Sequence, residues 1–359
     1  MRVVLDARPL SHPQSGGYRS YVMALVQGLA ELASTDVEIL LYLDRPVDFS
    51  LPFETRILSS SRLKTDFALF AQQVKRDQPD LVHGTVNYLP VGISSKTVLL
   101  LYDALLLKRY PWEAVVQRSL RQRLLNAYWA GLMRHSARTA TSVFTISQGS
   151  AQELASVLGG SPQRFLVVPL GISLPLPRAG VVREPTTILA IAAPDARKNI
   201  EALYEALPLL DDLNPTLKLV CTTARTAAAA EAEVARRGLK NVQLLRNLDN
   251  QALSDAYATA RVFVFPSRLE GFGLPPLEAM QAGTPVAASN ALPMPEILGA
   301  APLYFDPEKP AELAATVRCL LTSADEWGER SHAGIAQAKR YSLKAMAEGT
   351  LSLWRELAA

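Results

Sequence analysis

The sequence has little cysteine and no long apolar run. Only two of its 359 residues are cysteines, Cys221 and Cys319, and both lie in apolar segments. They offer neither a disulfide framework nor the spacing of a metal site, so we expect a reducing compartment, the cytoplasm. No apolar run reaches the ~18 residues of a membrane-spanning helix. The first residues, MRVVLDARPL, bring in Asp6 too early for a secretory signal, so we interpret them as a first core strand.

The sequence also lacks a large net charge, but its charges are unevenly placed. The formal net charge is +3. Residues 1–178 carry 19 Lys and Arg against 13 Asp and Glu, whereas the remainder carries 18 against 21. This contrast modestly favours an anionic partner for the first half.

Short apolar runs alternate with longer amphipathic stretches along the whole chain. The strand-like runs are VVLD, VEILLY, LVHG, TVLLLY and SVFTIS in the first half, and TILAIAA, LKLVCT, VQLL, RVFVF and PVAAS in the second. Helix-like stretches lie between them, for example residues 18–32, 67–76, 199–207 and 227–237. Continuous apolar strands separated by helices indicate parallel sheets covered on both faces. We therefore predict an α/β protein with two doubly wound domains.

The domain boundary is predicted from proline. Residues 167–187, VVPLGISLPLPRAGVVREPTT, contain four prolines and two glycines, which favour an extended connection over a helix. We predict an N-terminal domain at residues 1–170, a linker at 171–185 and a C-terminal domain at 186–340. Residues 341–359 are predicted to form a terminal helix that packs back toward the N-terminal domain.

The stretch SRLEGFGLPPLEAM, residues 267–280, carries the clearest chemistry. It follows the apolar run RVFVF, so it begins as a loop at the end of a strand, where ligands bind in open α/β sheets. Gly271 and Gly273 allow the backbone to approach a ligand, and a helix beginning near the double proline would attract an anion and end at Gly283. Glu270 and Glu278 at the two ends of the loop could accept hydrogen bonds from sugar hydroxyls. A ligand with sugars at both ends and phosphates between them, a nucleotide sugar, fits this pattern.

This stretch resembles the E-x7-E signature of the retaining glycosyltransferases of family 4. The likeness continues into PV and ASNALPMPEILG, and the segments VVPLGI, DARKNIEAL, SGGYRSYV, DLVHGTVNYLP and SVFTISQGSAQEL are similar to further family segments. The resemblance covers nearly the whole chain and is weaker in the first half. It implies the GT-B architecture, two Rossmann-like domains facing across a cleft.

The resemblance implies roles for residues on both sides of that cleft. Glu270 would contact the donor sugar, Glu278 the ribose, and Lys198 the leaving diphosphate. Arg197 lies beside Lys198, but neighbours on a helix point in different directions, so both need not serve. The remaining implied donor-binding residues are Gly16, Gly17, Asn247, Leu248, Gly271, Phe272, Gly273 and Leu274. An ordinary strand–helix turn is the alternative explanation for Gly16 and Gly17, and a solvated helix start is the alternative for Lys198.

The chain departs from the family pattern at two places. Tyr102 stands where members often carry a histidine, and Asp103 is retained; we count both as catalytic, although tyrosine does not shuttle protons near neutral pH. Ala192 and Ala193 replace a glycine and a polar residue before Lys198, so an arginine partner for Lys198 at the usual place is in doubt. We assign acceptor binding to Arg19 and to His83, with a structural histidine as the alternative for the latter.

Residues 108–138 form a basic stretch with seven Lys and Arg and one Glu. Its apolar residues recur at roughly helical spacing, and it includes two tryptophans. Such a helix can lie on an anionic membrane, or it can pack its apolar face on the sheet, which we favour. Nucleic acid is not an expected partner, because the sequence has no aromatic–basic recognition motif.

Together these features predict a retaining glycosyltransferase of polysaccharide assembly. It would move a hexose, with GDP-mannose favoured over UDP-sugars, to a glycan or lipid-linked acceptor by front-face attack. No Asp-x-Asp motif lies at a strand end, so we expect no essential metal and no cofactor. Two alternatives remain open: a catalytically silent sugar-nucleotide-binding or scaffold protein, and an enzyme that isomerises or phosphorolyses sugars.

Overall fold

The computed structural model describes residues 1–12, 17–108, 110, 119–193 and 195–358. The chain divides into two compact units, Met1–Ser173 with Tyr341–Ala359, and Leu174–Arg340. We call these the N-terminal unit and the C-terminal unit. The chain therefore changes unit between Ser173 and Leu174, and again between Arg340 and Tyr341.

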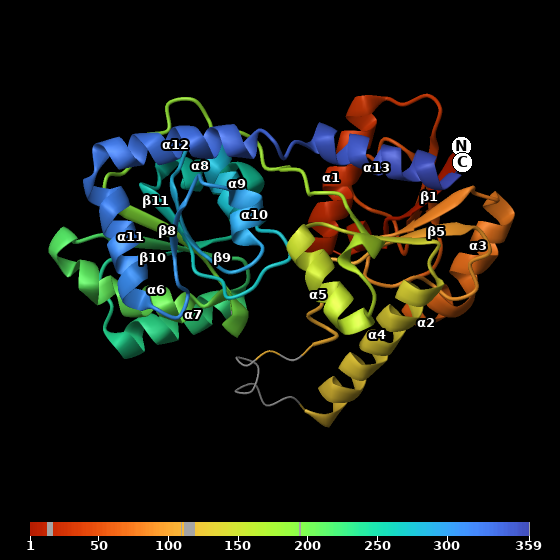
Figure 1. The fold of residues 1–359 in the computed structure, drawn as a ribbon, viewed down its shortest axis with the longest axis horizontal. Helices are drawn as coiled ribbons and strands as arrows, with labels where there is room; N and C mark the ends of the chain where they lie inside the picture. The colour runs from red at the N-terminus through yellow and green to blue at the C-terminus, as the bar shows by residue number, and fades with distance from the viewer. Residues whose placement is uncertain (13–16, 109, 111–118, 194, 359) are drawn as a thin grey trace. The chain divides into compact units, whose positions relative to one another are not determined.

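The N-terminal unit contains a seven-stranded sheet in the order β3-β2-β1-β4-β5-β6-β7 (Figure 1). Every pairing in it is parallel, for example Val3 with Ile39 and Val82 with Thr97. Its strands are β1 (Arg2–Asp6), β2 (Glu38–Leu43), β3 (Glu54–Ile57), β4 (Leu81–Gly84), β5 (Lys96–Leu100), β6 (Ser142–Thr145) and β7 (Phe165–Val167). Its α-helices are α1 (Gly17–Leu32), α2 (Arg62–Lys64), α3 (Phe70–Asp77), α4 (Leu120–Thr139), α5 (Gln148–Leu158) and α13 (Leu343–Ala358).

Close packing holds α13 in the N-terminal unit. A Cβ atom on Gly28 of α1 would lie 2.6 Å from the backbone oxygen of Leu343, so only glycine permits this approach of the two helices. At the other end of α13, the buried Trp354 donates its indole N–H to Nδ1 of His83 at 3.1 Å. The terminal helix thus contributes to the core beneath β4.

The C-terminal unit contains a six-stranded sheet in the order β10-β9-β8-β11-β12-β13, again wholly parallel. Its strands are β8 (Thr187–Ala192), β9 (Thr216–Cys221), β10 (Val242–Arg246), β11 (Val262–Phe265), β12 (Val286–Ser289) and β13 (Leu303–Phe305). Its α-helices are α6 (Ile200–Ala206), α7 (Ala224–Arg237), α8 (Asn250–Thr259), α9 (Leu274–Gln281), α10 (Met294–Leu298), α11 (Pro310–Thr322) and α12 (Ala324–Ala338). One face is covered by α6, α7 and α11, and the other by α8, α9 and α12 (Figure 1).

These orders confirm two doubly wound, Rossmann-like sheets. In the N-terminal unit the strand order reverses between β1 and β4, and in the C-terminal unit it reverses between β8 and β11. Loops that leave the two central strands of such a sheet diverge to opposite faces, which opens a crevice beyond their carboxyl ends. The loops after β1 and β4, and those after β8 and β11, are therefore the places to look for ligand sites.

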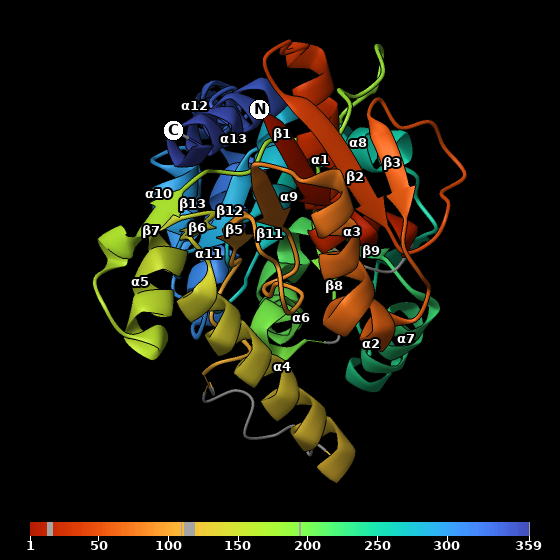
Figure 2. The same cartoon turned by 90° about the vertical axis from the view of Figure 1, so that its right-hand side faces the viewer.

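The basic stretch at residues 108–138 is only partly packed. Within α4, Ala130, Met133, Ser136 and Ala137 are buried, whereas residues 119–125 are all exposed. The first half of the helix extends away from the rest of its unit (Figure 2). The expectation that the apolar face packs on the sheet thus holds for the second half of α4 alone; Trp112 lies outside the described residues.

Candidate functional site

Two cations and one carboxylate meet at the switch point of the C-terminal unit. Arg197 and Lys198 belong to a short 3-10 turn after β8, Ala196–Lys198, and Glu270 lies in the loop after β11. The Nζ atom of Lys198 is 2.6 Å from Oε1 of Glu270, and Nη1 of Arg197 is 2.6 Å from Oε2. Residues 72 and 73 positions apart in the sequence therefore form one cluster, which we call the cation–carboxylate cluster.

We predicted that Arg197 and Lys198 need not both serve, but both side chains contact Glu270. The two long side chains bind different oxygens of the carboxylate, Lys198 at Oε1 and Arg197 at Oε2. Arg197 also donates to the carbonyl of Leu269 at 2.9 Å, and Asp195 accepts from its Nε at 3.3 Å. The Arg197 side chain is thus fixed by three partners, and Lys198 lies over the ring of Phe265 at 5.4 Å.

The electrostatics of the cluster keep Glu270 ionised. Burial alone would raise the pKa of its carboxyl, since only 9% of the side chain is exposed, but the adjacent Lys198 and Arg197 lower the pKa below its ordinary value. Lys198 remains the more accessible cation, with a quarter of its side chain exposed. A second anion, such as a diphosphate, could therefore reach Lys198 while Glu270 stays charged.

The start of α9 presents backbone donors next to the cluster. Gly273 caps the helix with φ of +105°, and a Cβ there would lie 2.8 Å from Cε of Met294, so the position requires glycine. Leu274 begins the helix, but the next two positions are Pro275 and Pro276, which have no N–H. The amide donors at this helix start therefore end at Leu274. Gly283, with φ of +73°, follows the last turn as predicted.

Glu278 lies one turn into α9 and is held by a residue that the sequence did not suggest. The hydroxyl of Tyr257 in α8 donates to Oε2 of Glu278 at 3.0 Å, and Tyr257 is fully buried. Burial raises the pKa of the Glu278 carboxyl to about 7, and the Tyr257 hydrogen bond opposes part of this rise. Nothing in the spacing of a tyrosine 21 residues upstream could have identified this pair.

In the C-terminal unit, the predicted donor-binding residues Asn247, Leu248, Gly271 and Phe272 lie in loops that follow strands. Asn247 and Leu248 directly follow β10, and Asn247 has a left-handed backbone with φ of +54°. Phe272 is buried, and Gly271 is half-buried. A cavity of about 390 Å³ lies beside the loop after β8 and is lined by Ala192, Ala193, Asp195, Asn199 and residues of α6 and α7. In the N-terminal unit, Gly17 begins α1, and Gly16 lies outside the described residues.

In the N-terminal unit, Tyr102 and Asp103 directly follow the β5 region. Tyr102 packs edge-on against Tyr18 and Tyr21, with ring centroids 4.9 and 5.6 Å apart. Its hydroxyl is buried, without a hydrogen-bond partner in the described part of the chain, and burial raises its pKa well above the ordinary value. Tyr102 therefore stays protonated at neutral pH. Asp103 accepts from the amide of Leu105 at 3.0 Å.

The two predicted acceptor-binding residues differ in accessibility. Arg19 is half-buried, donates to the carbonyl of Leu10 at 2.6 Å and lies over the ring of Phe49. His83 is fully buried: Nδ1 accepts from Trp354, and Nε2 lies 3.3 Å from the Tyr21 hydroxyl. Since both ring nitrogens are engaged in the core, His83 cannot contact an acceptor in this structure. Its contacts are those of a structural histidine, the alternative given above.

No helix among the described residues is long and apolar enough to cross a membrane. Nor do the described residues include a group of three or more His, Cys, Asp and Glu arranged to hold a metal ion.

Comparisons with known proteins find relatives of this chain. Residues 177–340 match the family described as Glycosyl transferases group 1, a range that contains the cation–carboxylate cluster and Glu278. The chain is 30% identical over 246 residues to O-antigen chain mannosyltransferase B of Escherichia coli, covering 64% of each chain. It is 31% identical over 243 residues to the MMP alpha-(1->4)-mannosyltransferase of Mycolicibacterium hassiacum, covering 64% of this chain and 58% of that protein. The matches thus span less than two thirds of these relatives' own length.

Among solved structures, the chain is similar to a sucrose-phosphate synthase from Thermosynechococcus elongatus. The TM-score is 0.79 at 20% identity, over 99% of this chain and 98% of the other. At that identity the likeness concerns the fold. The chain has the GT-B fold of two Rossmann-like units, and its residues 177–340 are similar to the group 1 glycosyl transferases.

Proposed function

We propose that this protein is a retaining glycosyltransferase that moves a hexose from a nucleotide diphosphate sugar to a hydroxyl of a glycan or lipid-linked acceptor. The observation that carries the proposal is the cation–carboxylate cluster at the switch point, beside the start of α9. It unites Lys198, Arg197 and Glu270 with the helix-start amides at a sheet edge where nucleotides bind in this class of fold.

The chemistry of transfer matches the charges in the cluster. The bond between the sugar C1 and the diphosphate oxygen breaks, the acceptor oxygen bonds to C1, and the acceptor proton passes to the leaving diphosphate. Negative charge grows on that diphosphate in the transition state, and a fixed cation such as Lys198 stabilises it. Because both cations are already held by Glu270, little reorganisation is needed when the charge develops.

Retention of configuration is proposed to follow from front-face attack by the acceptor. A double displacement would need a free carboxylate as nucleophile. Glu270, the carboxylate that the family resemblance places near the sugar, has each oxygen in a 2.6 Å ion pair. A carboxylate so engaged is a poor nucleophile, which favours direct attack by the acceptor hydroxyl.

We propose mannose as the sugar and GDP-mannose as the donor. The support is the names of the two relatives, both mannosyltransferases, one of them acting on the O-antigen chain. The corresponding setting is the assembly of a cell-surface polysaccharide in the cytoplasm. We further propose that transfer needs no metal ion, since Lys198 and Arg197 provide the positive charge; a chelator should then leave the rate unchanged.

Contact with an anionic membrane surface is proposed for the first half of α4. Leu120, Leu124 and Tyr128 recur at four-residue intervals and are exposed, with Arg121 and Arg123 between them. An apolar stripe flanked by cations suits the interface of an anionic bilayer. A lipid-linked acceptor would be available at that surface.

The test is a transfer assay with the full chain. GDP-mannose, GDP-glucose and UDP-glucose would be offered with a panel of acceptors, and the product's anomeric configuration read by NMR. We expect an α-linked product from an α-linked donor, and a loss of about 100- to 1,000-fold in Lys198→Ala and in Glu270→Ala, with circular dichroism at the assay temperature showing that both variants remain folded.

Matched controls come from an exposed ion pair of the same unit. Lys309→Ala and Glu312→Ala remove a lysine and a glutamate that contact each other at 2.9 Å, far out on the surface. Near-normal transfer by the Lys198 and Glu270 variants would overturn the site assignment. Donor binding without turnover on any acceptor would instead favour the silent sugar-nucleotide-binding protein.

A further inference from the structure

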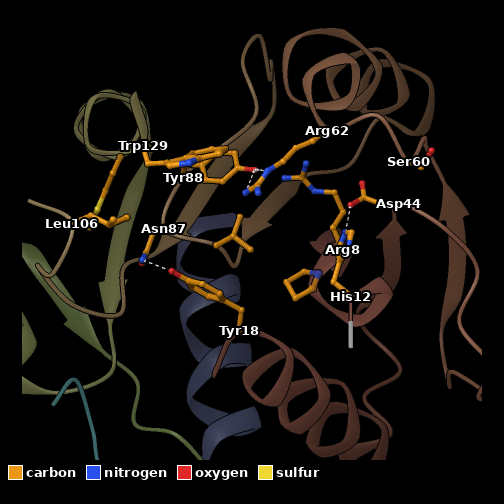
Figure 3. A pocket seen from close by; sticks show the side chains of 13 residues that line it. Arg8, His12, Tyr18, Asp44, Ser60, Arg62, Asn87, Tyr88, Leu106 and Trp129 are labelled. Atoms are coloured by element: carbon orange, nitrogen blue, oxygen red, sulfur yellow. Dashed lines mark hydrogen bonds and ion pairs between the residues drawn. The ribbon is translucent and has the colours of Figure 1, made fainter. Parts of the chain in front are cut away.

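A large cavity lies at the switch point of the N-terminal unit. It encloses about 460 Å³, within the range of small-molecule sites, and is lined by residues that follow β1, β2 and β4. Figure 3 shows Trp129 and Leu106 on one side of this pocket and Asp44 and His12 on the other. We call it the N-terminal pocket. It is the counterpart, in the first unit, of the cation–carboxylate cluster in the second.

The cations at this pocket are already neutralised. Arg8 is buried and binds Asp6 through two nitrogens, at 2.8 and 2.7 Å, and Asp66 through a third at 2.5 Å. Arg62 lies 3.8 Å from the same Asp66 and donates to the Tyr88 hydroxyl at 3.2 Å. With Asp44 included, two guanidinium groups face three carboxylates. An added phosphate would meet no uncompensated positive charge among these groups.

Asp44 supplies an unsatisfied acceptor. Its Oδ2 atom lies 2.8 Å from Nε2 of His12, but its Oδ1 atom has no hydrogen-bond partner among the residues that the structure describes. Only 8% of the side chain is exposed. A buried carboxylate oxygen without a donor costs free energy, so the position favours a ligand that brings an O–H or N–H group.

Most of the rest of the lining is aromatic or apolar, with Ser60 and Asn87 as further polar residues. Tyr88 and Trp129 lie with ring centroids 5.4 Å apart, and the Arg62 guanidinium covers the Trp129 ring at 4.2 Å. Tyr18 lies across the pocket, its hydroxyl accepting from Asn87 at 2.9 Å (Figure 3). A pyranose offers C–H groups to rings and hydroxyls to polar atoms around its edge, and this lining offers both kinds of contact.

We infer that the N-terminal pocket binds the neutral, non-phosphorylated sugar end of the acceptor, with a sugar hydroxyl donating to Oδ1 of Asp44. The inference rests on the proposed function in that a glycosyltransferase requires an acceptor. It adds the acceptor's chemical class, an uncharged carbohydrate, and the residue that distinguishes it from a phosphorylated one.

The test measures binding to the full chain without donor. Neutral methyl glycosides of mannose, glucose, galactose and N-acetylglucosamine, and the 6-phosphates of the same sugars, would be titrated and followed by ligand-observed NMR. We expect at least one neutral glycoside to bind, and its 6-phosphate to bind several-fold more weakly. Asp44→Ala should weaken neutral glycoside binding about 10- to 100-fold. Asp44→Asn should weaken it less, because the amide oxygen still accepts a hydrogen bond, although a weaker one than the charged carboxylate accepts.

Two further variants keep the test independent of folding defects. Leu106→Trp fills the pocket from a position whose side chain already reaches solvent, and should block glycoside binding. Asp48→Ala, at an exposed aspartate four residues beyond Asp44, should leave it unchanged. Absence of binding by every neutral glycoside, tighter binding of the phosphates, or unaltered binding in Asp44→Ala and Leu106→Trp overturns the inference.

Activity separates this inference from the proposed function. If the Asp44→Ala chain transfers sugar with an unchanged KM for the acceptor, the inference fails while the function stands. If neutral glycosides bind and depend on Asp44 but no donor is ever turned over, the pocket assignment stands while the proposed function fails. Affinity for GDP should be the same in all variants, since the cation–carboxylate cluster is untouched.

Discussion

Glu278 should make the ligand-free protein less stable as the pH rises. Its pKa in the fold is about 7, against an ordinary value of 4.5, because burial disfavours the charged carboxylate. Since the folded pKa lies above the unfolded one, the stabilising protonated form is fully present below about pH 4.5 and is lost as the pH rises through 7. The difference corresponds to about 3 kcal/mol, an upper figure because the side chain is partly reached by solvent.

Glu278→Gln tests this reasoning, since the amide resembles the protonated acid and does not titrate. The C-terminal unit spans 174–340, a size at which 1 kcal/mol changes the melting temperature by about 2–4 °C. The variant and the wild type should melt together at pH 4. At pH 8 the variant should melt up to roughly 6–12 °C higher, measured by thermal denaturation of that unit.

Glu205→Gln provides the control, because Glu205 is an exposed glutamate of the same unit. The melting temperature of Glu205→Gln should differ from that of the wild type by the same amount at every pH. A Glu278→Gln difference that is equally constant, or a wild type that becomes the more stable protein at pH 8, would refute a buried carboxyl with a raised pKa.

Three other predictions concern binding and backbone geometry. GDP affinity, measured by calorimetry, should rise between pH 5 and 7 as Glu278 ionises and accepts hydrogen bonds from the ribose hydroxyls. Tyr257→Phe should move this rise to higher pH, because the Tyr257 hydrogen bond lowers the pKa of Glu278. An affinity that does not change with pH would contradict this role of Glu278. Gly273→Ala should lower the free energy of unfolding by about 1–3 kcal/mol through its positive φ and the Met294 contact, and an unchanged melting curve would contradict the geometry. Leu124→Ser should reduce the amount of protein that sediments with anionic vesicles but not the amount that sediments with neutral ones. If variant and wild type sediment equally with anionic vesicles, the membrane proposal fails.

Apart from the edge strand β10, the strands that the sequence predicted are those in the middle of the sheets. Apolar runs identified β1, β2, β4, β5 and β6, and likewise β8 to β12. The three that were missed, β3, β7 and β13, are all edge strands of three or four residues. The strand β3 reads ETRI and is largely exposed, so it has no apolar run to detect. An edge strand is fixed by its one neighbour in the sheet, and that pairing is not visible in local sequence.

The candidate site divides in the same way. Glu270 and Lys198 follow strands that pattern alone could place, and the fold's reversal of strand order then brings them together. Tyr257 and Asp44 could not be predicted, because what matters about them is a contact made in the folded chain: a hydrogen bond to Glu278, and an acceptor oxygen without a donor. The sequence analysis assigned His83 to acceptor binding because its hydrogen bond with Trp354, 271 residues away, is likewise visible only in the folded chain.

Charge summed over half a sequence is a poor guide to what a pocket binds. The basic excess of the first half favoured an anionic partner there, yet the guanidinium groups at the N-terminal pocket are held by Asp6 and Asp66. Arg121 and Arg123, on the exposed half of α4, have no ion pair with another described residue, and their position suits a surface and not a cavity. In the C-terminal unit, whose half of the chain has a negative total, Lys198 and Arg197 share the buried carboxylate of Glu270, and Arg197 also pairs with Asp195. We therefore base the proposal of a diphosphate in the second unit on the accessible Lys198 beside the helix-start amides, and the inference of a neutral sugar in the first on Oδ1 of Asp44, which has no donor among the described residues.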